Sequence, residues 1–159
     1  MSYSAAVLTV SDRSYKKIRE DLSGKTLVNL LKNDGFNVTY DIVPDESKMI
    51  KNKLKFFCKK KITLILTTGG TGLAVRDVTT EATLDISEKN VYGLSEYLRI
   101  QSMKLTPFAC LSRGVSVIRD HSLIINFPGS VNAVNQYYDF LKPVLIHAIK
   151  TLLGENTGH

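Results

Sequence analysis

The chain has 159 residues, of which 43% are hydrophobic and 23% are charged, and its formal net charge is +6. This length suits one domain over residues 1–159, and the composition is ordinary for a soluble globular protein. No apolar run approaches the roughly 20 residues that span a bilayer, and residues 1–12 lack the pattern of a secretory signal. We therefore expect a cytoplasmic protein with no membrane partner.

Hydrophobic patterning predicts alternating strands and helices along the first half of the chain. A strand over residues 3–10 is followed by a helix that Ser23 can cap, a strand over 36–43, and a helix over 47–60 that Ser47 can cap. Residues 62–67 are apolar and β-branched, which is typical of a strand buried on both faces of a mainly parallel sheet.

The second half predicts helices over 80–88 and 93–104, a short apolar stretch at 108–111, strands over 115–118 and 123–127, and a last helix that Ser130 can cap. The last two strands are separated by a short polar turn. We expect them to pair as an antiparallel hairpin at the edge of the sheet.

Much of the positive charge lies on the helix predicted over 47–60, in the lysine-rich residues 48–61. Alternating lysines usually form the solvated face of a helix, whereas nucleic-acid binding requires aromatic side chains that are free to stack. Phe56 and Phe57 are close by, but Phe57 falls on the apolar face. We expect no nucleic-acid partner, and the charge is compatible with a small polyanionic ligand.

The strand over 62–67 leads into the sequence Thr68-Gly69-Gly70-Thr71-Gly72. Glycine lets the backbone turn sharply and approach a ligand closely, and successive N–H groups in such a loop form an anion nest. Ligands of open α/β sheets bind beyond the carboxyl ends of strands, so a phosphate-bearing ligand is the first hypothesis. The loop matches neither a Walker loop nor a dinucleotide fingerprint, and a tight turn without a ligand is the alternative.

Polar residues follow each predicted strand of the first half. Ser11 and Asp12 come after the first strand, Asp45 after the second, and Arg76-Asp77 after the glycine loop. A guanidinium suits phosphate, while a carboxylate beside phosphates makes sense mainly through a bound cation. The alternatives are ordinary turn residues and a surface ion pair.

The segments 67–72, 76–79 and 81–83 together resemble the signature of the molybdopterin adenylyltransferase family, which includes bacterial MogA- and MoaB-type proteins and the G domain of gephyrin. Further matches occur at 9–12, 21–24, 43–46, 107–113 and 124–129. Two positions depart from the family pattern. Thr80 stands where proline is usual, and Ser130-Val131 replaces the usual Asn-Pro.

The resemblance implies a three-layer α/β sandwich with a mostly parallel central sheet and an antiparallel edge. It also implies a reaction in which the phosphate of molybdopterin attacks the α-phosphorus of ATP, with Mg²⁺ present. Relatives commonly form homotrimers and sometimes hexamers. The competing hypotheses are a molybdopterin carrier without transferase activity and a self-associating scaffold module.

By the same resemblance, Asp45 and Asp77 are expected to be the catalytic carboxylates and the Mg²⁺ ligands. The resemblance further implies a set of residues that line the molybdopterin and nucleotide site: Ser11, Asp12, Ser23, Thr68, Gly69, Gly70, Thr71, Gly72, Ser112, Arg113, Pro128 and Gly129.

Overall fold

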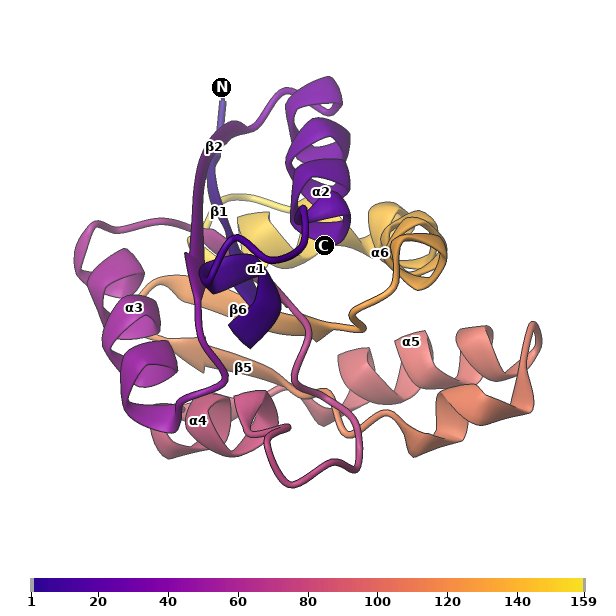
Figure 1. The fold of residues 1–159 in the computed structure, drawn as a ribbon. Coiled ribbons are helices and arrows are strands. Elements are labelled where there is room, and N and C mark those ends of the chain that lie inside the picture. The colour runs from indigo at the N-terminus through magenta and orange to yellow at the C-terminus, as the bar shows by residue number, and fades with distance from the viewer. Residues whose placement is uncertain (1, 159) are drawn as a thin grey trace.

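A six-stranded sheet lies between two layers of helices in the computed structural model, which describes residues 2–158 (Figure 1). The strands are β1 (Ser4–Val10), β2 (Asn37–Val43), β3 (Leu64–Thr68), β4 (Lys89–Asn90), β5 (Ser116–Arg119) and β6 (Ser122–Phe127). Their order in the sheet is β2-β1-β3-β6-β5-β4. The pairs among β2, β1, β3 and β6 are parallel, whereas β5 is antiparallel to both β6 and β4.

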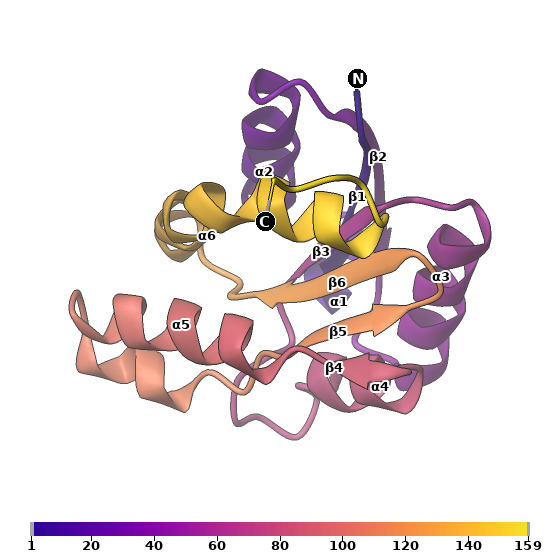
Figure 2. The same ribbon diagram turned by 180° about the vertical axis from the view of Figure 1, so that it is seen from behind.

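Seven helical segments connect these strands. They are α1 (Asp12–Tyr15), α2 (Leu22–Asn33), α3 (Ser47–Lys59), α4 (Thr79–Asp85), α5 (Tyr92–Met103), the 3-10 helix η1 (Pro107–Leu111) and α6 (Val131–Leu152). Helices α2, α5 and α6 pack on one face of the sheet, and α3 and α4 pack on the other (Figures 1 and 2). The structure therefore confirms the expected three-layer α/β fold.

Strand β3 is central because both of its faces are covered. All five of its residues are buried. Leu64 and Leu66 pack into the core under α2 and α6, while Ile65 points to the opposite core under α3 and α4. This alternation follows from the two-residue period of a strand. The glycine loop leaves the carboxyl end of β3, as the sequence predicts.

Two local predictions were wrong. The cap of α2 is Asp21, whose carboxylate accepts from the Gly24 amide, and not Ser23. Helix α3 begins at Ser47 itself, after Glu46, without a side-chain cap. The predicted antiparallel hairpin of β5 and β6 is confirmed, and β6 also pairs in parallel with β3. The short strand β4, which was not predicted, pairs with β5 and lies outermost at this antiparallel edge.

None of the helices among residues 2–158 combines the length and the hydropathy that a membrane span requires. The longest, α6, is amphipathic, with one side buried against the sheet. This finding agrees with the short apolar runs of the sequence.

Candidate active site

The glycine loop turns so tightly that side chains have no room in it. Gly69 and Gly70 have positive φ angles of 95° and 70°. A Cβ on Gly69 would collide with the Val10 carbonyl oxygen, and one on Gly70 would collide with the Thr79 hydroxyl. The loop is therefore packed between the end of β1 and the start of α4, and only glycine fits there.

A cleft of about 480 Å³ opens beside this loop, beyond the carboxyl ends of the parallel strands. It is lined by residues that follow β1, β2, β3 and β6, together with the start of α2. Eight of the predicted site residues line it: Ser11, Ser23, Asp45, Thr68, Gly69, Gly70, Asp77 and Gly129. The structure thus brings Asp45 and the glycine loop together in one cleft.

The other predicted site residues do not line the cleft. Among the described residues, the lining leaves out Asp12, Thr71, Gly72, Ser112, Arg113 and Pro128. Several of them fasten neighbouring segments to each other. The Thr68 hydroxyl donates to the Pro128 carbonyl at 2.7 Å, and the Thr71 carbonyl accepts from the Arg113 amide at 2.9 Å. Their predicted binding role stays a prediction.

Asp45 is half-buried and lines the cleft. Its Oδ2 accepts from the Asp12 amide at 2.8 Å. Burial raises the pKa of the Asp45 carboxyl above its ordinary value, and the charges of Asp12 and Asp77 add to this effect. A carboxylate in such a position gains most from a nearby cation.

Asp12 has the opposite electrostatic environment. Arg76 donates to its two oxygens at 2.6 and 2.8 Å, and this pairing lowers the pKa of Asp12. The Arg76 guanidinium is therefore engaged by a protein carboxylate beside the cleft, which fits the surface ion pair that the sequence left open.

Asp77 is held by the turn that precedes it. Its Oδ2 accepts from the Ala74 amide at 3.0 Å, and its own amide donates to the Ala74 carbonyl at 3.0 Å. This leaves Oδ1 without a hydrogen bond among the described residues. Asp77 can therefore present one oxygen to the cleft without breaking the turn.

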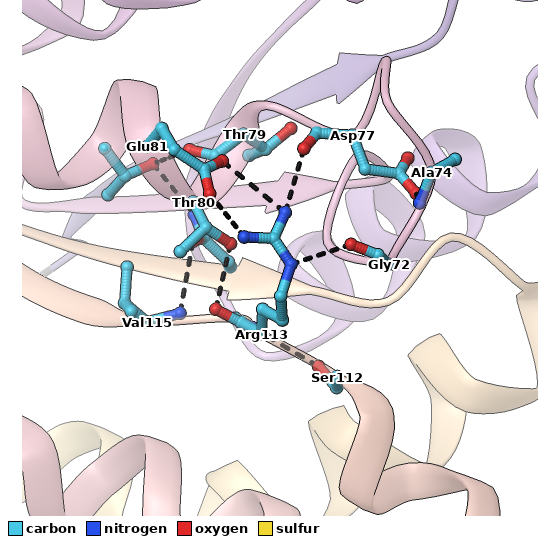
Figure 3. Close-up of polar contacts among 12 residues, drawn as sticks. Gly72, Ala74, Asp77, Thr79, Thr80, Glu81, Ser112, Arg113 and Val115 are labelled. Atoms are coloured by element: carbon cyan, nitrogen blue, oxygen red, sulfur yellow. Dashed lines mark hydrogen bonds and ion pairs between the residues drawn. The ribbon is translucent and has the colours of Figure 1, made fainter.

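Arg113 fixes the segment between the glycine loop and α4 (Figure 3). Its Nε donates to the Gly72 carbonyl at 2.8 Å, its Nη2 donates to the Asp77 carbonyl at 2.8 Å, and its Nη1 pairs with Glu81. The Thr80 hydroxyl donates to the Arg113 carbonyl at 2.9 Å. Arg113 therefore points at the loop backbone, and through it helps to place Asp77.

Asp21 and Arg19 are two of the nine lining residues that were not among the predicted site residues. Asp21 is only 7% exposed, and its carboxylate accepts from Thr9, Tyr40 and Gly24. Its position before Ser23-Gly24 was the available signal. Arg19 lies in the α1–α2 connection, and nothing in the spacing of the sequence identified it.

The carboxylates of the cleft fit a cation that is shared with a substrate. Among residues 2–158, no group of three or more His, Cys, Asp or Glu residues could hold a metal alone. Mg²⁺, however, is often bound by one or two carboxylates together with substrate phosphates and water. Asp45 and Asp77 line the same cleft, and the charge of Asp77 affects the pKa of Asp45. They are the residues that could provide such ligands.

The fold and the site define an α/β domain with a ligand cleft beyond its parallel strands. The protein-family model described as "Probable molybdopterin binding domain" matches residues 6–147 of this chain. Molybdopterin adenylyltransferase of Helicobacter pylori is 40% identical over 93% of this chain and 86% of that protein. The crystal structure of MoaB from Thermus thermophilus has a TM-score of 0.90 at 39% identity, covering 96% of this chain and 98% of the other.

Longer proteins also contain this unit. The molybdenum cofactor synthesis protein cinnamon of Drosophila melanogaster is 40% identical over 99% of this chain, which spans 26% of that protein's length. The chain belongs to the molybdopterin-binding domain family that these relatives share. This result confirms the resemblance seen in the sequence.

Proposed function

We propose that this chain is a molybdopterin adenylyltransferase of molybdenum cofactor biosynthesis, which uses ATP and Mg²⁺ and releases pyrophosphate. The observation that carries the proposal is the convergence of Asp45 and Asp77 with the glycine loop in one cleft. Three relatives that bear this enzyme's name are 37–40% identical to this chain, which covers 71–86% of their length. The two carboxylates favour catalysis over a carrier role, because simple retention of a phosphate does not need them.

In the proposed reaction, a phosphate oxygen of molybdopterin forms a bond to the α-phosphorus of ATP, and the bond to the pyrophosphate oxygen breaks. The attacking phosphate is already ionised at neutral pH, so the site does not need a strong general base. Catalysis then depends on alignment and on stabilisation of the developing charge.

The residues of the cleft suit these tasks. The Gly69 amide donates to the Phe127 carbonyl at 3.3 Å, so the Gly70 amide, which no described residue engages, is the loop N–H that would donate to a phosphate oxygen. The Ser23 hydroxyl donates to the Gly129 carbonyl at 2.6 Å, which ties the start of α2 to the segment after β6 and fixes the width of the cleft. When bound by Asp45 and Asp77, Mg²⁺ would neutralise phosphate charge.

The most direct test is incubation of the protein with molybdopterin, ATP and Mg²⁺, followed by detection of adenylyl-molybdopterin. The proposal predicts that product appears together with pyrophosphate. Tight molybdopterin binding without any product would instead identify the carrier.

We also propose a cytoplasmic homotrimer, with a hexamer as the larger alternative. In support, Val75 is 97% exposed, and Leu105 and Phe108 are 56% and 76% exposed. Contiguous exposed apolar patches often mark protein interfaces, and Leu105 and Phe108 lie close together in the chain, around the turn between α5 and η1. Sedimentation equilibrium at micromolar concentration should give three times the chain mass, and a monomer across the whole range would reject this assembly.

A further inference from the structure

The charges around the cleft are unbalanced for a site that takes phosphate groups. Its lining contains four acidic residues, Glu20, Asp21, Asp45 and Asp77. Among the described residues, Arg19 is the one cationic side chain in the lining. The two other arginines near the loop are not available, because Arg76 pairs with Asp12 and Arg113 with Glu81.

Arg19 itself has no such partner. Within residues 2–158, its guanidinium makes no hydrogen bond or ion pair. The neighbouring Glu20 does not neutralise it, since Glu20 pairs with Lys25 at 2.8 Å. An unpaired arginine is ordinary on an open surface. At the rim of an acidic cleft, however, it supplies the positive charge that a phosphate ligand requires.

The backbone holds Arg19 at this rim. The α1–α2 connection folds back on α1, with the amides of Ile18 and Arg19 both donating to the Arg13 carbonyl, at 2.9 and 3.4 Å. Lys17 adopts a positive φ of 58° at the turn. Asp21 then begins α2 and is anchored in the core. Arg19 is therefore held between two fixed points.

We propose that Arg19 binds a phosphate group of the substrate and sets the affinity of this cleft for phosphorylated ligands. The proposal rests on the proposed function for the identity of the substrate, but its chemistry requires only a phosphate. A planar guanidinium can donate two parallel hydrogen bonds to phosphate oxygens. The phosphate could belong to the nucleotide or to molybdopterin.

The test is calorimetric titration with inorganic pyrophosphate at saturating Mg²⁺, and in a second arm with molybdopterin. Arg19→Gln is compared with Arg13→Gln, which removes the same charge from an exposed arginine that does not line the cleft. We expect Arg19→Gln to weaken the binding of at least one of the two ligands by about tenfold, or about 1.4 kcal/mol. Arg13→Gln should have a much smaller effect on binding. Thermal unfolding should show that both variants are folded.

The two arms identify the source of the phosphate. Loss of pyrophosphate affinity assigns Arg19 to the nucleotide, and loss of molybdopterin affinity assigns it to the pterin phosphate. Equal losses in both variants, or no loss in either arm, would overturn the inference. Turnover by the unmodified protein is measured separately, so a failure of the proposed enzyme activity is distinguishable from a failure of the Arg19 assignment.

Discussion

Asp12 and Asp45 exchange hydrogen bonds through their backbone amides and carboxylates. The Asp12 amide donates to Asp45 Oδ2 at 2.8 Å, and the Asp45 amide donates to Asp12 Oδ1 at 3.0 Å. The ends of β1 and β2 are thereby locked together, two like charges are held close, and Arg76 neutralises only the first of them. Among the described residues, Asp45 forms no ion pair, although the nearby charge of Arg76 opposes part of the rise in its pKa.

Replacement of Asp45 by asparagine should separate stability from function. Because its pKa is raised in the folded protein, the folded state binds the proton more tightly than the unfolded chain does. The stability that Asp45 contributes is therefore present below its ordinary pKa of 3.8 and lost as the pH rises through the raised value. Asp45→Asn removes that loss, so its Tm at pH 7 should equal or exceed that of the unmodified protein.

Adenylyl transfer by Asp45→Asn should nevertheless fall by about 100-fold, the scale typical of one electrostatic group. Asp139→Asn, at an exposed position of α6, is the control and should alter neither quantity. A lower Tm for Asp45→Asn than for the unmodified protein at pH 7 would contradict the charge argument.

The Arg113 contacts predict that lysine cannot replace this arginine. A single ammonium cannot reach the Gly72 carbonyl, the Asp77 carbonyl and Glu81 together, so Arg113→Lys should lower the free energy of unfolding by about 2 kcal/mol. Because Asp77 shifts with the loop, kcat should fall more than KM rises. Arg99→Lys is the matched control, since one nitrogen of Arg99 makes both of its bonds, to the Ser112 and Gly114 carbonyls. Equal effects of the two changes would contradict this account.

Thr80 offers a comparison with the proline that is usual in the family. Thr80→Val removes the hydrogen bond to the Arg113 carbonyl but keeps the shape, and should cost about 1 kcal/mol in chemical denaturation. Thr80→Pro loses the same bond, but proline is tolerated in the first turn of a helix and restricts the unfolded chain. Thr80→Pro should therefore be more stable than Thr80→Val. The reverse order would show that proline does not suit the first turn of α4, and unchanged stability of Thr80→Val would show that the hydroxyl is unimportant.

The buried Asp21 links the core to the cleft. Tyr40 donates its hydroxyl to Asp21, which caps α2 and so positions Ser23. Tyr40→Phe should reduce the free energy of unfolding by about 1–2 kcal/mol. It should also slow adenylyl transfer at temperatures well below its Tm, where the variant is folded. Tyr138→Phe removes a similar bond, to Asp34 at 2.8 Å, at the C-terminal end of α2 and outside the cleft lining. It should cost similar stability without slowing the reaction, and equal activity in both variants would reject the link.

The sequence predicted the features that depend on residues close together in the chain. The apolar run before three glycines predicted β3, its central place and the cleft beside its end, because burial and backbone freedom are readable from neighbouring residues. The partners of distant side chains were not predictable. Arg113 reaches a carbonyl 41 residues earlier in the chain, and Asp21 accepts from Thr9 on β1 and Tyr40 on β2. Which of Asp21 and Ser23 caps α2 depends on those tertiary contacts.

The central claim is that Asp77 acts through its charge on a phosphate reaction and is more than a turn residue. The measurement is single-turnover formation of adenylyl-molybdopterin by Asp77→Asn beside Asp85→Asn, whose exposed carboxylate pairs with Lys51 away from the cleft. Asparagine can still accept the hydrogen bond from the Ala74 amide, so the turn should survive. We predict that Asp77→Asn lowers the single-turnover rate by about 100-fold and changes molybdopterin affinity little, while Asp85→Asn leaves the rate unchanged. Turnover of Asp77→Asn near the rate of the unmodified protein would contradict the account.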